Sequence, residues 1–168
     1  MPKRLRTSAS ALDEVLRRLE VLEKRVPRKM AGVAEDERYW LLEKLSHHPR
    51  PGAVAYGGVV DLPNGEHYIW QRESKAQDLY ALEWESVTHV IGGLAHPVRL
   101  ALLKALLEGR RSTAELQKLE GLGTTGQLYH HLKALERGGW VRSLERGVYG
   151  VPGERVVPLL AVLSACLG

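Results

Sequence analysis

The sequence predicts a mainly α-helical protein with a small amount of β structure. Apolar residues recur at helical spacing along most of the chain. Two stretches, at residues 53–71 and 140–151, instead place β-branched and aromatic residues on both sides of a turn sequence, which is typical of β-hairpins. We divide the chain into an N-terminal helix (1–30), an acidic, aromatic-rich segment with one helix and one hairpin (31–78), and a helical domain with the second hairpin (79–168).

The composition is that of a soluble globular protein. Of its 168 residues, 44% are hydrophobic and 26% are charged, and no apolar run approaches the roughly 20 residues that span a bilayer. The basic start of the chain lacks the apolar core and cleavage site of a secretory signal. We therefore expect a cytoplasmic location and no membrane partner. The single cysteine, Cys166, excludes an internal disulfide, and we expect it to be buried as a small apolar side chain.

The net charge of +4 is unevenly distributed along the chain. Residues 1–30 hold 9 basic and 4 acidic side chains, residues 31–86 hold 5 and 10, and residues 87–168 hold 10 and 6. Basic segments are attracted to polyanions such as nucleic acids, whereas an acidic segment is repelled by them. The charge pattern favours nucleic-acid contacts at the two ends of the chain and a different role for the middle.

The first helix extends from a cap at Ser8 or Ser10 to Val26, because Pro27 disfavours helical geometry in the residue before it. Its apolar residues follow a seven-residue period, which is typical of a short coiled coil. The alternative is an amphipathic helix that packs on its own domain, since about three heptads are few for a coiled coil. We favour dimerisation through a seam formed by Leu12, Val15, Leu19, Leu22 and Val26.

The middle segment predicts a helix over residues 35–45, followed by a hairpin. Adjacent His47 and His48 lack the i, i+4 spacing that places two metal ligands on one helical face, so we assign no metal to them. Residues 63–65, Pro-Asn-Gly, fit a bulged turn in which glycine takes the left-handed position. This turn joins the strand-like stretches around 54–60 and 67–71.

Aromatic residues are concentrated in this segment, where seven of the ten lie between Tyr39 and Trp84. One interpretation is a small-molecule effector pocket lined by Tyr56, Tyr68 and Trp70. The other is core packing, because a chain without Phe must fill its interior with Tyr and Trp. Both interpretations remain open from the sequence.

Four helices are expected next, and three of them have the spacing of a helix-turn-helix. Residues 79–94 form a helix with an apolar stripe, and Pro97 begins a second that ends at Gly109. Ser112-Thr-Ala-Glu115 is a capping box that opens a short helix through Leu119. After the turn at 121–124, Thr124 or Thr125 caps a helix that runs to Arg137.

The last of these helices has the pattern of a DNA recognition helix. Leu128, Leu132 and Leu135 make one face apolar, so the opposite face is exposed. Such a face can donate and accept hydrogen bonds at base edges and phosphates in a major groove. Its polar residues are Thr125, Gln127, Tyr129, His130 and Lys133.

A second hairpin completes a winged helix. Residues 140–144 and 148–151 are strand-like and are joined by a turn at 145–147. Arg142 and Arg146 would lie on this wing, where arginine can bind phosphate or enter the minor groove. Arg111, at the start of the helix-turn-helix, is a further candidate for DNA binding. A final apolar helix over 154–167 can pack against a partner.

The sequence resembles the ArsR-like group of bacterial winged-helix repressors over roughly residues 85–151. The resemblance rests on Leu94-Ala-His-Pro-Val-Arg-Leu100, on Ser112-Thr-Ala-Glu-Leu116, and on Leu128-Tyr-His-His-Leu-Lys-Ala-Leu135 followed by Gly-Gly-Trp-Val. It implies a homodimer that binds a pseudo-palindromic site in double-stranded DNA. The groove-facing positions of the family correspond to Thr124, Thr125, Gln127, Tyr129 and His130.

The resemblance does not extend to the metal sites of that group. Its metal sensors carry a cysteine pair in the second helix or histidine and acidic ligands in the last one. Here those stretches read Glu-Leu-Gln-Lys-Leu (115–119) and Val-Val-Pro-Leu-Leu (156–160). We therefore expect neither a metal nor another cofactor.

Two other classes of function are compatible with parts of this sequence. Winged helices also serve as protein-docking modules, and a polar helix face can simply be solvated. An enzyme is disfavoured because His47, His67 and His89 lie in separate elements and no nucleophile elbow, phosphate loop or metal motif is present. We expect a DNA-binding regulator that is not an enzyme.

Overall fold

The computed structural model describes residues 14, 15, 17, 18 and 40–167. The chain divides into two compact units, residues 1–54 with 75–77 and residues 55–74 with 78–168. The domain boundaries expected near residues 30 and 78 remain predictions. Of the predicted dimer seam, Leu12, Leu19, Leu22 and Val26 lie outside the described residues, and Val15 is exposed. In the first unit, α2 (Trp40–Ser46) ends where the sequence predicts.

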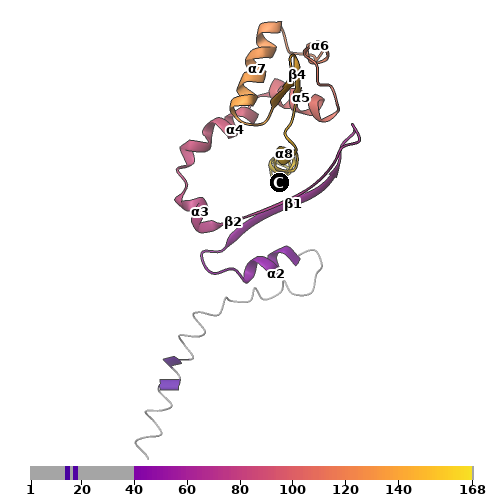
Figure 1. Cartoon of the computed structure of the whole chain (residues 1–168). Coiled ribbons are helices and arrows are strands. Elements are labelled where there is room, and N and C mark those ends of the chain that lie inside the picture. The colour runs from indigo at the N-terminus through magenta and orange to yellow at the C-terminus, as the bar shows by residue number, and fades with distance from the viewer. Residues whose placement is uncertain (1–13, 16, 19–39, 168) are drawn as a thin grey trace, which may run out of the picture. The chain divides into compact units, whose positions relative to one another are not determined.

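The second unit contains the other elements except for the outer ends of β1 and β2 and the first residues of α3, and most of the elements are labelled in Figure 1. It is mainly helical and has two small two-stranded sheets, β1 with β2 and β3 with β4. The fold class that the sequence predicts is therefore confirmed. The elements are β1 (Ala53–Asp61), β2 (His67–Lys75), α3 (Ala76–Ala81), the 3-10 helix η2 (Trp84–Val87), α4 (Thr88–Leu94), α5 (Pro97–Leu107), α6 (Thr113–Leu116), α7 (Thr125–Arg137), β3 (Arg142–Glu145), β4 (Val148–Gly150) and α8 (Gly153–Ala165).

The turn of the first hairpin has the predicted geometry. Gly65 has a φ of 85°, and its N–H donates to the carbonyl of Leu62 over 2.9 Å. The Leu62 N–H in turn donates to the Glu66 carbonyl, also over 2.9 Å. Only glycine adopts such a positive φ without strain, which explains why Gly65 occupies this position. The strands are longer than the sequence indicated, reaching Asp61 on one side and Lys75 on the other.

The single helix predicted over residues 79–94 is wrong, because the chain is interrupted at Leu82 and Glu83. Glu83 has φ −68° and ψ 103°, an extended conformation that separates α3 from η2. The Trp84 Nε1–H donates to the Leu79 carbonyl over 2.9 Å and so satisfies a carbonyl near the end of α3. As a result Leu79 and Leu82 are exposed and only Leu94 of the expected stripe is buried.

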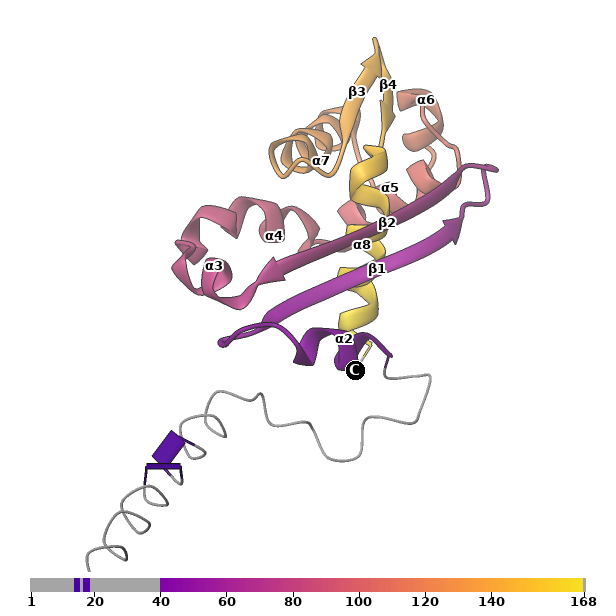
Figure 2. The same cartoon turned by 60° about the horizontal axis from the view of Figure 1, so that its bottom comes forward.

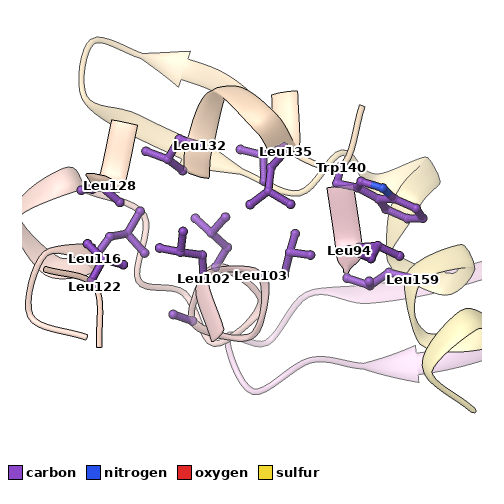
Figure 3. Close-up of a cluster of buried hydrophobic side chains, with 13 residues drawn as sticks. Leu94, Leu102, Leu103, Leu116, Leu122, Leu128, Leu132, Leu135, Trp140 and Leu159 are labelled. Atoms are coloured by element: carbon purple, nitrogen blue, oxygen red, sulfur yellow. The ribbon is translucent and has the colours of Figure 1, made fainter. Parts of the chain in front are cut away.

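The core lies between α5, α6, α7 and the start of the wing, as Figure 3 shows. Leu128, Leu132 and Leu135 on one face of α7 are at most 1% exposed, which confirms the predicted apolar face. Trp140 closes one end of this core, and its Nε1–H donates to the Val90 carbonyl of α4 over 2.7 Å. The cluster consists of Leu94, Leu102, Leu103, Ala105, Leu106, Leu116, Leu122, Leu128, Leu132, Leu135, Trp140, Val141 and Leu159.

The first hairpin crosses α8, and its tip reaches toward the end of α5, as Figure 2 shows. A Cβ placed on Gly58 of β1 would lie 3.2 Å from Val157 of α8, and one on Gly153 would lie 3.0 Å from the Tyr68 ring. At the tip, a Cβ on Gly109 would lie 3.2 Å from the Asn64 Cβ. Glycines at these three positions therefore allow the close approach of the hairpin to the winged helix.

Two smaller expectations are also wrong. Cys166 is exposed rather than buried, because it follows α8 beyond the last residues of that helix that pack inward. The short second helix ends at Leu116 rather than at Leu119, and Leu119 lies in the turn that follows.

Among the described residues no single helix is long and apolar enough to cross a membrane. Helices 84–94 and 97–107 have the length and apolar composition of a membrane span only when they are taken together, and the two are bent by 73° relative to each other.

Candidate nucleic-acid interface

The helix-turn-helix begins with a capping box, as predicted. The Ser112 side chain accepts from the Glu115 N–H over 3.2 Å, and the Glu115 carboxylate accepts from the Ser112 N–H over 3.0 Å. The Ser112 hydroxyl, followed by the Ser112 backbone, lowers the pKa of Glu115. Both partners satisfy N–H groups that the start of a helix leaves free. The box fixes where α6 begins and hence how it presents the turn to α7.

The turn between α6 and α7 is built by glycine and by a second capping box. Gly121 and Gly123 have φ values of 76° and 73°, and the Gln117 side chain donates to the Gly123 carbonyl over 3.0 Å. At the start of α7 the Thr124 side chain accepts from the Gln127 N–H, and the Gln127 side chain accepts from the Thr124 N–H over 2.7 Å. Thr124 and Gln127 therefore orient the recognition helix in addition to lying at predicted groove-facing positions.

The face of α7 opposite its buried leucines is exposed and carries no carboxylate. The only acidic residue of the helix, Glu136, is half-buried and lies at its end. The Arg137 Nε donates to the Lys133 carbonyl over 3.4 Å. Arg137 was not predicted as a site residue, although its position four residues after Lys133 indicates the same face. The exposed residues are Thr125, Gly126, Gln127, Tyr129, His130, Lys133 and Arg137.

Three imidazole rings lie close together beside this face of α7. The His131 ring is half-buried and lies 4.6 Å from the His96 ring at the start of α5 and 5.7 Å from the His130 ring. Burial, followed by the neighbouring histidines and Arg99, lowers the pKa of His131. The edge-on contact between His131 and His130 limits the orientations of the exposed His130 ring.

The wing is anchored to the helix-turn-helix by backbone hydrogen bonds. Arg142 pairs with Gly150 and Ser143 with Tyr149, with a bulge before Glu145. The Tyr149 N–H donates to the Arg111 carbonyl and the Thr113 N–H to the Gly147 carbonyl, each over 2.9 Å. Arg142 and Arg146 are exposed, and no described carboxylate forms an ion pair with either. Both guanidinium groups are therefore available to an outside anion.

Arg111 differs from the two wing arginines because it is already paired. Its guanidinium donates to the Glu66 carboxylate of the first hairpin over 2.6 Å. Asn64 and Tyr68 each donate to the other oxygen of Glu66 over 3.0 Å. The hydrogen bond from Arg111 is the largest cause of the lowered pKa of Glu66. Sequence reasoning missed Glu66, because its partner lies 45 residues away and no local pattern marks the pair.

One of the three aromatic residues predicted to line a pocket lies at a cavity of the described structure. Tyr68 lines a cavity of about 140 Å³ between the first hairpin and the wing, whereas Tyr56 and Trp70 do not. Tyr68 lies near the tip, where β2 passes Gly153 at the start of α8, and Trp70 is 37% exposed further along the strand. Among the described residues no group of three or more His, Cys, Asp and Glu side chains could hold a metal ion.

The family model described as "Helix-turn-helix domain" matches residues 94–143, from the end of α4 to the first strand of the wing. The chain contains a helix-turn-helix domain. This match supports a DNA-binding regulator in general terms, with DNA as its partner. No curated protein matches the chain.

Proposed function

We propose that the protein is a homodimeric, sequence-specific transcriptional repressor of the ArsR-like type that uses neither a metal nor catalysis. The exposed face of α7 carries this proposal, because it presents a tyrosine, a histidine and two basic side chains and has no carboxylate. Polar side chains on such a helix can bind base edges in the major groove, and basic ones can bind phosphates. Arg142 and Arg146 on the wing extend this surface to the flanking backbone.

The cap geometry supports a rigid recognition helix. Thr124 and Gln127 satisfy N–H groups at the start of α7, and three leucines hold its other face in the core. A helix fixed at its start and along one side loses little freedom when it enters a groove, so less of the binding free energy is spent on ordering. Of the predicted base contacts, Thr125, Tyr129 and His130 have side chains without a capping role in the described structure.

In the proposed homodimer, a second copy of the chain contacts the second half of the DNA site. Two-fold dimers bind half-sites about one helical turn apart and thereby double the number of contacts. The described residues expose Tyr80, Trp84 and Ile91, each more than 60% accessible, on consecutive elements. Exposed large apolar side chains can mark interaction sites, so these three residues are candidates for the interface. The N-terminal heptads offer another interface for the same dimer.

The test is selection of bound duplexes from a random DNA library with the purified chain. We expect enrichment of a two-fold-symmetric sequence, and an affinity for it that falls with added salt as phosphate contacts release counterions. A Lys133→Ala, Tyr129→Ala variant should lose the enrichment, while a Val59→Ala control, at an exposed position of β1 outside both proposed surfaces, keeps it. No enrichment and no salt-dependent affinity would contradict the proposal and favour a protein-docking winged helix.

A further inference from the structure

The cavity beside the wing has walls of two different kinds. It lies where β2 of the first hairpin passes the wing and the end of α5, and its volume is about 140 Å³. Leu106, Leu107 and Leu144 form part of an apolar wall. Glu66, Tyr68, Arg111 and Arg142 form the polar wall. Such a combination of apolar surface and a few polar groups is typical of small-molecule sites.

The charges of the polar wall leave one guanidinium unpaired. Glu66 already accepts hydrogen bonds from Arg111, Asn64 and Tyr68, so its charge balances that of Arg111. Arg142 forms no ion pair with a described residue. Arg142 lines the same cavity as Tyr68, whose pKa burial and then Glu66 raise, while Arg111 and Arg142 lower it. The polar wall therefore carries a net charge of about +1.

We propose that this cavity binds a small organic acid, whose carboxylate pairs with Arg142 while its apolar body lies against the leucine wall. An arginine guanidinium binds a carboxylate through two parallel hydrogen bonds, which a neutral amide cannot reproduce. The volume is close to that of apolar cavities of roughly 150 Å³ that hold one benzene molecule. The ligand class is therefore a monocarboxylate with a body about the size of one aromatic ring.

Occupation of this site is linked to DNA binding through the wing. Arg142 and Leu144 both belong to β3, and Gly150 of β4 also lines the cavity. An acid bound to Arg142 takes up the guanidinium that is otherwise available to phosphate. It therefore lowers the affinity for DNA, a consequence that rests on the proposed repressor function. Binding of the acid itself does not depend on that function.

The test uses benzoate as the probe and benzamide as its uncharged counterpart. Both are titrated into the isotopically labelled full chain while the backbone amide resonances of Gly150, Val151 and Gly153 are followed. We expect saturable shifts with benzoate, with a dissociation constant on the order of 1 mM as befits a ligand of this size. Benzamide should bind at least about tenfold more weakly, because it lacks the charge that Arg142 recognises.

Two matched variants locate the site. Arg142→Gln should weaken benzoate binding by about tenfold or more, whereas Arg146→Gln, the same change on the wing turn outside the cavity, should leave it unaltered. Equal binding of benzoate and benzamide, or equal affinity of the two variants for benzoate, would overturn the proposal. Because these titrations contain no DNA, their failure is distinguishable from failure of the repressor function, which the DNA selection tests.

Discussion

The winged helix and the first hairpin differ in what holds them in place. The winged helix, α5 to β4, is organised around thirteen buried side chains and two capping boxes, each formed within four residues of chain. The hairpin, β1 and β2, buries only Leu62 and is tied to the winged helix by glycine contacts and by the pair of Glu66 with Arg111. The first region is fixed by packing and the second by a few polar and close-approach contacts, so we expect the hairpin to open at a lower cost in free energy than the winged helix.

The largest expected effect is the loss of a core leucine in the winged helix. Leu128→Ala should lower the free energy of unfolding by about 2–5 kcal/mol, because the side chain is fully buried and its removal leaves a cavity. The matched change on the hairpin, Val59→Ala, should cost less than about 0.5 kcal/mol, since Val59 is 68% exposed. Urea denaturation measures both. Similar losses for the two variants would show that the hairpin is packed as tightly as the helices.

The same difference decides which parts of the fold could be predicted from the sequence. Ser112 with Glu115, and the i, i+4, i+7 leucines of α7, are local patterns whose physics is contained in a few residues. The pair of Glu66 with Arg111 joins residues far apart, and no periodicity encodes it. The break at Leu82 and Glu83 was missed for a related reason, because the hydrogen bond from Trp84 to Leu79 does not alter the apolar spacing.

The sequence predicted which residues form the exposed face of α7, but it predicted neither all of their contacts nor the position of the cavity. The exposed face of α7 follows directly from the position of its leucines, so Tyr129, His130 and Lys133 could be assigned to it. Gln127 was assigned to base reading by position, yet its side chain also accepts from the Thr124 N–H. The pocket could not be located, because its walls come from the hairpin, α5, the wing and the residues that begin α8.

The next effect concerns the function of the winged-helix surface. Tyr129→Ala should reduce discrimination between the selected DNA site and a scrambled one by about 1–3 kcal/mol if the side chain contacts bases. Tyr129 is 40% exposed and lies outside the core cluster, so the unfolding curve should stay unchanged. Binding isotherms for both DNA sequences measure the effect. An equal loss on the two sequences would exclude base reading by Tyr129.

A smaller effect is expected from the first capping box. Ser112→Ala removes the acceptor for the Glu115 N–H and should lower the free energy of unfolding by about 1 kcal/mol. Ser164→Ala, near the end of α8, is the control, because Ser164 is exposed and caps no helix start. Thermal or urea unfolding compares the two. A loss for Ser112→Ala no greater than for the control would mean that the box contributes to geometry without contributing to stability.

The smallest effect tests the contact that joins the two regions. A double-mutant cycle with Glu66→Gln and Arg111→Gln should give a coupling of about 0.2–1 kcal/mol, since both side chains are more than a third exposed and water screens the pair. Glu120→Gln, at an exposed carboxylate outside the described ion pairs, is the control and should show no coupling with Arg111.

The pair also predicts a dependence of stability on pH. The pKa of Glu66 in the folded chain is lowered from 4.5, chiefly by Arg111, so the unfolded chain binds the proton more readily. The stabilisation is therefore fully present above pH 4.5 and is lost as the pH falls through the folded pKa. In urea unfolding, the difference in the free energy of unfolding between the wild type and Glu66→Gln should shrink as the pH is lowered from 6 toward 3. A difference that stays constant over this range would show that the hairpin is held by its glycine contacts, with the ion pair contributing nothing measurable.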